Sequence, residues 1–214
     1  MKKYVTEFIG TFFLVLTVGL TAGANALAIG TALMVMIYAG GHISGAHYNP
    51  AVTLAVLVRN RISVMDAVIY MVSQILGGAV AAMIVMYFRE DIPSEAHQTI
   101  DTTKALIAEV IGTFALAYVV LNVATAKANA GNSYFGLAIG FTVMAMAFAL
   151  GSYSGGAFNP AVAVGASVMK AFEWPNIWIY LVGCFGGGAL AGVVFNMLNP
   201  EEKRPVTGPA DKID

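Results

Sequence analysis

Residues 44–52 read Ser-Gly-Ala-His-Tyr-Asn-Pro-Ala-Val, and residues 154–162 read Ser-Gly-Gly-Ala-Phe-Asn-Pro-Ala-Val. In each copy, Asn-Pro opens a short apolar stretch, over 50–58 and 160–169, which is too short to cross a bilayer. Asn is a favoured N-cap and Pro fits the first position of a helix, so one copy alone indicates only a helix start. Two copies at matching places indicate a binding or conduction site made of broken helices.

The composition around these motifs is that of a membrane protein. Of 214 residues, 58% are hydrophobic and 11% are charged, against about 25% charged in soluble domains. The net charge of −1 and the absence of a Lys/Arg cluster argue against a nucleic-acid partner. Long apolar runs predict an all-α membrane protein with six transmembrane helices and two re-entrant half-helices, the spans being 4–22, 26–40, 66–88, 104–126, 134–150 and 176–197.

An internal repeat organises these spans. Residues 7–12, Glu-Phe-Ile-Gly-Thr-Phe, reappear as Glu-Val-Ile-Gly-Thr-Phe at 109–114, which argues against a signal peptide at the N-terminus. Each half therefore holds three spans and one half-span, and because three is odd, the two halves have opposite orientations in the membrane. The predicted parts are a first half-repeat at 1–103, a second at 104–199 and a disordered cytoplasmic tail at 200–214.

The basic residues set the orientation. With both termini in the cytoplasm, most of the Lys and Arg residues fall on that side, as the positive-inside rule requires. The predicted cytoplasmic set is Lys2, Lys3, Arg59, Arg61, Lys127, Lys203, Arg204 and Lys212, whereas Arg89, Lys104 and Lys170 fall outside. The longest external loop is predicted at 89–103. The chain is therefore expected to lie in a plasma or inner membrane, in contact with lipid.

Inversion brings the two half-helix N-termini together near the bilayer centre. Each terminus carries roughly +0.5 of a charge, so the pair opposes cations and protons. The side-chain amides of Asn49 and Asn159 are expected to donate hydrogen bonds to a passing oxygen. The Gly-rich approaches at 40–45 and 151–156 are predicted to be irregular backbone that lines a water-filled path.

The paired motifs, the Glu-x-x-Gly-Thr-Phe start of each half and the Gly-Gly-Ala at 77–79 and 187–189 resemble the aquaporin and aquaglyceroporin family, over about residues 4–197. The resemblance implies a homotetramer with one pore in each subunit and passive permeation of water or small uncharged solutes. It also implies that Glu7 and Glu109 accept hydrogen bonds from the backbone of the loops, although a position at the membrane interface is the alternative for both. The implied pore motifs are Asn49, Pro50, Ala51, Asn159, Pro160 and Ala161.

The sequence departs from this family at the external constriction. Most members have Arg three residues after the second Asn, whereas this chain has Val162. By the family's spacing, the other three filter positions fall on Ile29, Ala147 and Gly156. This set lacks the Arg and the His of water-selective relatives, so the resemblance implies a wider, less polar and uncharged filter. The preference between water and larger solutes is left open.

The remaining candidates are few. His42 and His47 flank the first turn and are candidates for lining the cytoplasmic side of the pore; no acidic or Cys residue lies near them in sequence, so no metal or other cofactor is expected. Cys184 lies in an apolar run and is interpreted as a buried small hydrophobe. An ion- or proton-coupled transporter with inverted repeats is the alternative function, but Asn49 and Asn159 have no Asp or Glu neighbours in sequence. No enzyme motif is present.

Overall fold

The computed structural model describes residues 1–89 and 100–202. In these parts the chain is helical, and six helices are long and apolar enough to cross a membrane. The predicted fold class is thereby confirmed. The six long helices are α1 (Lys2–Leu20), α2 (Ala26–Ser44), α4 (Val64–Phe88), α5 (Thr102–Thr125), α6 (Phe135–Ser154) and α8 (Ile177–Leu198).

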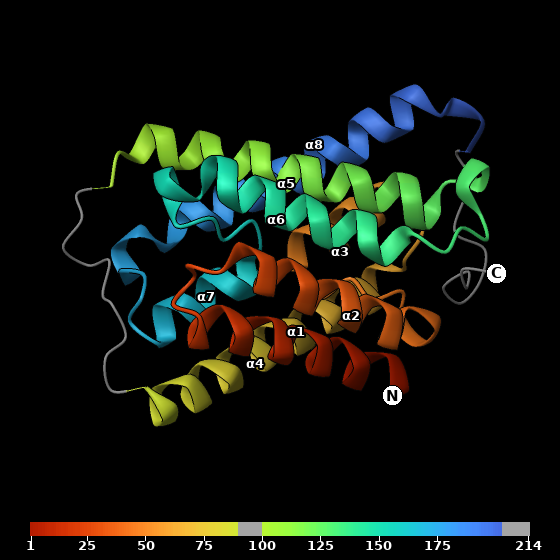
Figure 1. Cartoon of the computed structure of the whole chain (residues 1–214). Helices are drawn as coiled ribbons and strands as arrows, with labels where there is room; N and C mark the ends of the chain where they lie inside the picture. The colour runs from red at the N-terminus through yellow and green to blue at the C-terminus, as the bar shows by residue number, and fades with distance from the viewer. Residues whose placement is uncertain (90–99, 203–214) are drawn as a thin grey trace.

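One short helix completes each half of the bundle: α3 (Pro50–Val58) in the first half and α7 (Pro160–Val168) in the second. Figure 1 shows both between the long helices, with α1, α2 and α4 on one side and α5, α6 and α8 on the other. Each short helix packs most closely against a long helix of the opposite half: α3 against α8, and α7 against α4. The two halves are thus interlocked through their half-helices.

Glycines make this interlocking close. A Cβ atom at Gly188 of α8 would lie 2.4 Å from the carbonyl oxygen of Ala51, and one at Gly78 of α4 would lie 2.7 Å from that of Ala161. Both distances are below any real carbon–oxygen contact, so only glycine allows these helices to approach the two Asn-Pro-Ala turns. Small residues at helix interfaces in membranes commonly serve this purpose.

The prediction of irregular backbone over 40–45 and 151–156 is wrong for most of both stretches. Helix α2 continues to Ser44 and α6 to Ser154, and each ends on a glycine in the left-handed conformation, Gly45 with φ 84° and Gly155 with φ 83°. Both helices continue because backbone N–H and C=O groups at membrane depth need hydrogen-bond partners, and the i→i−4 bonds of a helix supply them. Gly40 has a packing role there, since a Cβ atom would overlap the hydroxyl of Tyr48.

The predicted tail at 200–214 requires a correction at its start. Pro200–Glu202 forms a 3-10 turn, η4, in which Glu202 is buried, because its carboxylate pairs with the guanidinium of Arg59. Residues 203–214 lie outside the described residues, as do 90–99 of the predicted external loop. Two further 3-10 turns, η2 (Lys127–Asn129) and η3 (Trp174–Asn176), lie in the loops before α6 and α8.

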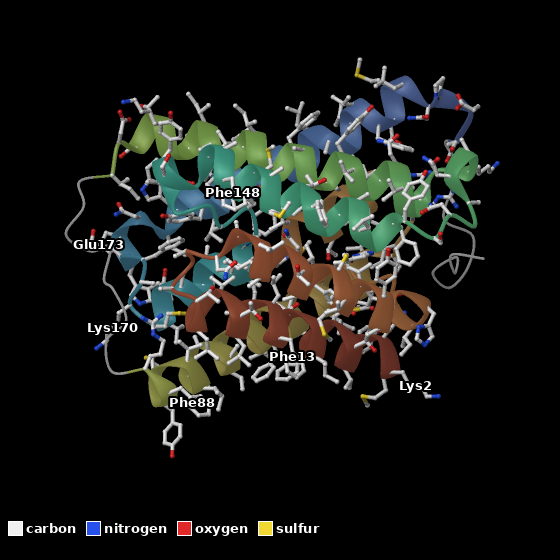
Figure 2. The ribbon with its side chains drawn as sticks, viewed as in Figure 1. Lys2, Phe13, Phe88, Phe148, Lys170 and Glu173 are labelled. Atoms are coloured by element: carbon white, nitrogen blue, oxygen red, sulfur yellow. The ribbon has the colours of Figure 1, made fainter. Side chains whose placement is uncertain are left out.

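The outer surface of the bundle is apolar and its two ends are polar. Phe13 and Phe88 are 46% and 68% exposed on the outside of the helices, as expected of side chains that face lipid. Figure 2 shows Lys2 at one end of the bundle and Lys170 with Glu173 at the opposite end. This placement agrees with the predicted separation of Lys2 from Lys170 across the membrane.

Candidate functional site

The two Asn-Pro-Ala turns meet at the centre of the bundle and brace each other. The Asn49 side-chain amide donates a hydrogen bond to the carbonyl oxygen of Phe158 at 2.9 Å, and the Asn159 amide donates to that of Tyr48, also at 2.9 Å. Each Asn is thus fixed by the residue that precedes the other Asn. A side-chain amide has two N–H donors, so one donor on each Asn is left for another acceptor.

The same two side chains cap the half-helices. The Asn49 Oδ1 atom accepts the backbone N–H of Ala51 at 2.8 Å, and the Asn159 Oδ1 atom accepts that of Ala161 at 2.9 Å. Pro50 and Pro160 occupy the first helical positions, where a missing N–H costs nothing. Helices α3 and α7 therefore point their N-termini, with their partial positive charges, at a common region.

The turn before α3 is held by Glu7, whose side chain is fully buried. One carboxylate oxygen accepts hydrogen bonds from the Ser44 hydroxyl at 2.6 Å and the His47 backbone N–H at 3.0 Å. The other oxygen accepts them from the Tyr48 backbone N–H at 2.7 Å and the Gln74 amide at 2.8 Å. The Glu7 side chain therefore accepts four hydrogen bonds inside the bundle, which is incompatible with a place at the membrane interface.

Glu109 holds the second turn in the same way. It is also fully buried, and it accepts hydrogen bonds from the Ser154 hydroxyl at 2.7 Å and from the backbone N–H groups of Ala157 and Phe158 at 3.0 and 2.7 Å. The fourth donor is the thiol of Cys184 at 3.3 Å. Cys184 is buried, as predicted from its apolar run, but it also takes part in this polar cluster.

A cavity of about 360 Å³ lies over the junction of the two turns. It is lined by Asn49 and Asn159 and otherwise mainly by apolar side chains from both halves of the chain. A second cavity, of about 430 Å³, opens toward the end that carries Lys3, Arg61 and Lys127. His47 and Val120 line both cavities, so the two spaces adjoin at these residues. The two cavities lie on either side of these shared residues, next to the Asn-Pro-Ala turns.

Comparison with known proteins agrees with this geometry. A model of the family "Major intrinsic protein" matches residues 1–195. The chain belongs to this family. This major intrinsic protein is accordingly a passive membrane channel for water and small uncharged solutes, and it is an integral membrane protein.

The relatives of this major intrinsic protein include proteins named as aquaporins and one named as a glycerol uptake facilitator. It is 35% identical to "Glycerol uptake facilitator protein-like 6" of Lactiplantibacillus plantarum, over 94% of this chain and 100% of that protein. It is 37% identical to "Aquaporin TIP2-1" of Zea mays, over 91% of this chain and 86% of that protein. The X-ray structure of the aquaglyceroporin from Plasmodium falciparum has the same fold, with a TM-score of 0.80 at 24% identity, over 94% of this chain and 98% of that one.

The four residues that the resemblance predicted as a filter all line the 360 Å³ cavity. Ile29 comes from α2, Ala147 from α6, Gly156 from the loop before α7 and Val162 from the first turn of α7. Ile29 comes from the first half of the chain and the other three from the second half, and all four line one space. Among the described residues, the polar side chains that line this cavity are those of His47, Asn49 and Asn159.

The two predicted histidines differ in their surroundings. His42 lies in the last turn of α2, is exposed and lines only the 430 Å³ cavity. His47 lies in the turn before α3, where its ring packs edge-on against Tyr70 at 5.2 Å between ring centroids. Its Nδ1 atom is 3.1 Å from the Thr53 hydroxyl. Within the described residues, no group of three or more His, Cys, Asp or Glu side chains is arranged to hold a metal ion.

Sequence reasoning missed several partners of the turns. The Tyr70 hydroxyl donates to the carbonyl oxygen of Ser44 at 2.8 Å, and the Tyr180 hydroxyl donates to that of Ser154 at 2.7 Å. Both pairs are related by the 110-residue offset that relates Asn49 to Asn159, so the repeat itself contained the signal.

The buried pair of Arg59 and Glu202 was missed as well. Arg59 follows α3, and its guanidinium donates to the Glu202 carboxylate and, at 2.7 Å, to the carbonyl oxygen of Thr125. Burial lowers the pKa of Arg59, which the Glu202 charge partly offsets. Glu202 also accepts the backbone N–H of Lys127 at 2.9 Å. No sequence pattern pointed to this pair, because its members lie 143 residues apart.

Proposed function

We propose that this channel passes neutral solutes of the size of glycerol or urea alongside water, and that it excludes protons and other ions. The observation that carries the proposal is the apolar, uncharged set of Ile29, Ala147, Gly156 and Val162 around the 360 Å³ cavity. Ala and Gly leave space where bulkier side chains would narrow the path. Val162 cannot donate a hydrogen bond, whereas an Arg offers five donors in a fixed fork.

The charges along the path support an uncoupled channel rather than a coupled transporter. In coupled transporters, an acidic side chain on the path commonly takes up and releases the driving ion. Among the described residues, neither cavity is lined by an Asp or a Glu. The buried carboxylates of Glu7 and Glu109 are instead fully occupied by donors of the turns. For the same reason we propose no enzymatic role.

Exclusion of cations follows from the half-helices. The N-termini of α3 and α7 converge on the region between Asn49 and Asn159, and their partial positive charges act in a low-dielectric surrounding. This barrier does not depend on an Arg at position 162. A neutral solute with an oxygen acceptor meets the free N–H of each Asn amide and feels no such barrier.

The orientation and assembly are part of the proposal. Lys3, Arg61 and Lys127 line one cavity, which supports a cytoplasmic location for that end under the positive-inside rule. Both termini are then cytoplasmic, and the host membrane is the plasma or inner membrane. We further propose a homotetramer with one pore in each subunit, which cross-linking in native membranes tests directly.

The test of the filter is Val162→Arg, with Val162→Leu as the matched control. Purified variants in proteoliposomes are exposed to gradients of sucrose, glycerol and urea, and the volume change is followed by light scattering. Val162→Arg is expected to lower glycerol and urea flux several-fold while water flux stays within a few-fold of the parent, because the guanidinium narrows the path but still donates to water. Val162→Leu adds bulk without donors. Unchanged solute flux in folded Val162→Arg contradicts the proposed filter.

A further inference from the structure

The two cavities meet at a boundary formed by His47 and Val120. Among the described residues, these two alone line both cavities. The 360 Å³ cavity is lined by the four predicted filter residues and also by Asn49 and Asn159. This cavity is therefore one continuous space from the predicted external filter to the Asn-Pro-Ala turns. The boundary with the 430 Å³ cavity lies beyond both of these sites.

One face of α5 lines both cavities and locates the boundary along the helix. Leu116 lines only the 360 Å³ cavity, whereas Val120 lines both. One turn later, Val123 and Ala124 line only the 430 Å³ cavity. Residues three or four positions apart lie on the same face of a helix, so these side chains follow one another along the two cavities. Val120 therefore stands where one space ends and the other begins.

Helix α3 locates the boundary independently. Val52 lines only the 360 Å³ cavity, and Val56, one turn later, lines only the 430 Å³ cavity. Helix α3 starts at Pro50, directly after its Asn49 cap, and runs away from the meeting point of the two turns. At 1.5 Å per residue, the boundary lies about 5–10 Å along α3 from the cap. Two helices from different halves of the chain thus agree on its position.

The repeat provides an internal comparison for this boundary. At the 102-residue offset that relates α1 to α5, Val120 corresponds to Val18, and at the 110-residue offset of the turns, His47 corresponds to Ala157. Val18 and Ala157 both line the 360 Å³ cavity, which continues past them. The valine is the same in both halves, so the difference is the turn residue. A boundary forms where the valine is matched with an imidazole ring, and none forms where it is matched with a methyl group.

The His47 ring is a fixed wall of the boundary. It packs edge-on against Tyr70 at 5.2 Å between ring centroids, and its Nδ1 atom is 3.1 Å from the hydroxyl of the fully buried Thr53. Its backbone N–H is bound to Glu7 at 3.0 Å. The ring cannot move aside without losing these contacts. Val120 is branched at Cβ and is largely confined to one rotamer in a helix, so its two methyl groups are a second rigid wall.

We propose that Val120 is the residue that sets the largest solute cross-section that this channel passes, because it narrows the boundary between the two cavities against the fixed ring of His47. The proposal rests on the channel function above and adds the place where solutes are selected by size. That place is Val120 rather than the four predicted filter residues, around which the cavity stays open. The effect of Val120 is steric, so it acts on the width of a neutral solute and not on its hydrogen-bonding groups.

Flux through three variants in proteoliposomes tests the proposal. Val120→Ala is expected to raise the ratios of glycerol and urea flux to water flux by about threefold or more, because interiors are packed tightly enough for the loss of two methyl groups to widen the boundary. Val120→Leu is expected to lower the same ratios by about threefold. Val18→Ala is the matched control, because this valine lines only the 360 Å³ cavity. Its ratios are expected to stay within about twofold of the parent.

Two results overturn the proposal. One is a change of the flux ratios in Val18→Ala as large as that in Val120→Ala, and the other is unchanged ratios in both Val120→Ala and Val120→Leu. A parent that passes water alone refutes the solute size proposed above and leaves the role of Val120 to be decided separately. In that case Val120→Ala is expected to admit urea or glycerol while Val18→Ala is not, and a Val120→Ala channel that still passed water alone would overturn the inference.

A second measurement uses water flux alone and leaves no enlarged cavity. Cysteine is a small hydrophobe, so Val120→Cys and Val18→Cys are expected to fold as the parent does. Methyl methanethiosulfonate then adds a methylthio group to each new thiol, and the parent, whose Cys184 is fully buried, is the control. The reagent is expected to lower water flux by about threefold or more in Val120→Cys and by less than about twofold in Val18→Cys. Equal losses in the two variants, with labelling of both verified by mass spectrometry, overturn the proposal.

Discussion

Replacing Gly188 by Ala tests how closely the Asn-Pro-Ala turn must be held. A Cβ atom at this position would lie 2.4 Å from the carbonyl oxygen of Ala51, whereas an ordinary contact begins at 3.4 Å. Helix α8 and the turn must therefore separate by about 1 Å, and overpacking of this kind costs about 1–3 kcal/mol. Ala51 directly follows Pro50 in the turn, so the shift is transmitted to Asn49 and weakens its 2.9 Å hydrogen bond to Phe158.

The same helix supplies the control. Gly186 is exposed, and no atom lies within 4 Å of the place where its Cβ would be. Gly186→Ala is therefore expected to leave flux unchanged and to stabilise α8 by up to about 1 kcal/mol through helix propensity. A Cβ atom at Gly78 would lie 2.7 Å from the carbonyl oxygen of Ala161. The effect of Gly78→Ala on flux and stability should therefore lie between those of Gly188→Ala and Gly186→Ala.

The assay pairs water flux in proteoliposomes with the midpoint of thermal unfolding in detergent. Gly188→Ala is expected to lower both, the flux several-fold, because the widened turn no longer holds Asn49 against Phe158. The loss of water flux and of unfolding midpoint should be largest in Gly188→Ala, smaller in Gly78→Ala and smallest in Gly186→Ala. If Gly188→Ala had the same flux and the same midpoint as Gly186→Ala, the idea that Gly188 is needed for close approach of α8 to the turn would be refuted.

Two further outcomes follow from the charges. Vesicles that contain the channel are expected to show no proton or Na⁺ current under an imposed potential, because the N-termini of α3 and α7 oppose cations; a protein-dependent current that tracks the potential would refute this account. Glu202→Ala leaves the buried Arg59 charge without its partner and is expected to cost about 3 kcal/mol, seen as a Tm lowered by roughly 5–10 °C. Glu201→Ala, at the exposed neighbour, is the control and should leave the Tm unchanged.

The sequence was sufficient for the broken-helix architecture because the signals there are local. Asn as a cap and Pro at the first helical position gave 50–58 for α3, as observed, and α7 ends one residue before the predicted 169. The inversion followed from counting spans. The extent of α2 was underestimated, because Gly40 and Gly41 weaken a helix in water but serve packing here, where Tyr48 occupies the space of a side chain at Gly40.

The hydrogen-bond partners of the turns could not be predicted from local pattern. Gln74 meets Glu7 across 67 residues, and Cys184 meets Glu109 across 75. Neither pair can be recognised from the hydropathy pattern or from turn residues. A polar residue in a span gives the same sequence signal whether its side chain contacts a buried partner or lines a cavity. The four predicted filter positions were chosen only through the resemblance to a family, and the structure brings these residues around one cavity.

The repeat contains more information than its motifs, because its offset changes along the chain. Glu7 and Glu109 are 102 residues apart, whereas Asn49 and Asn159 are 110 apart, so the second half holds eight more residues between these points. Part of this excess forms the segment 126–134 with the turn η2, between α5 and α6. This segment lines the 430 Å³ cavity through Lys127, and the Lys127 backbone N–H binds Glu202. A segment that carries part of this difference in length is therefore also the place where the C-terminal end of the described chain is attached, at the entrance that we assign to the cytoplasm.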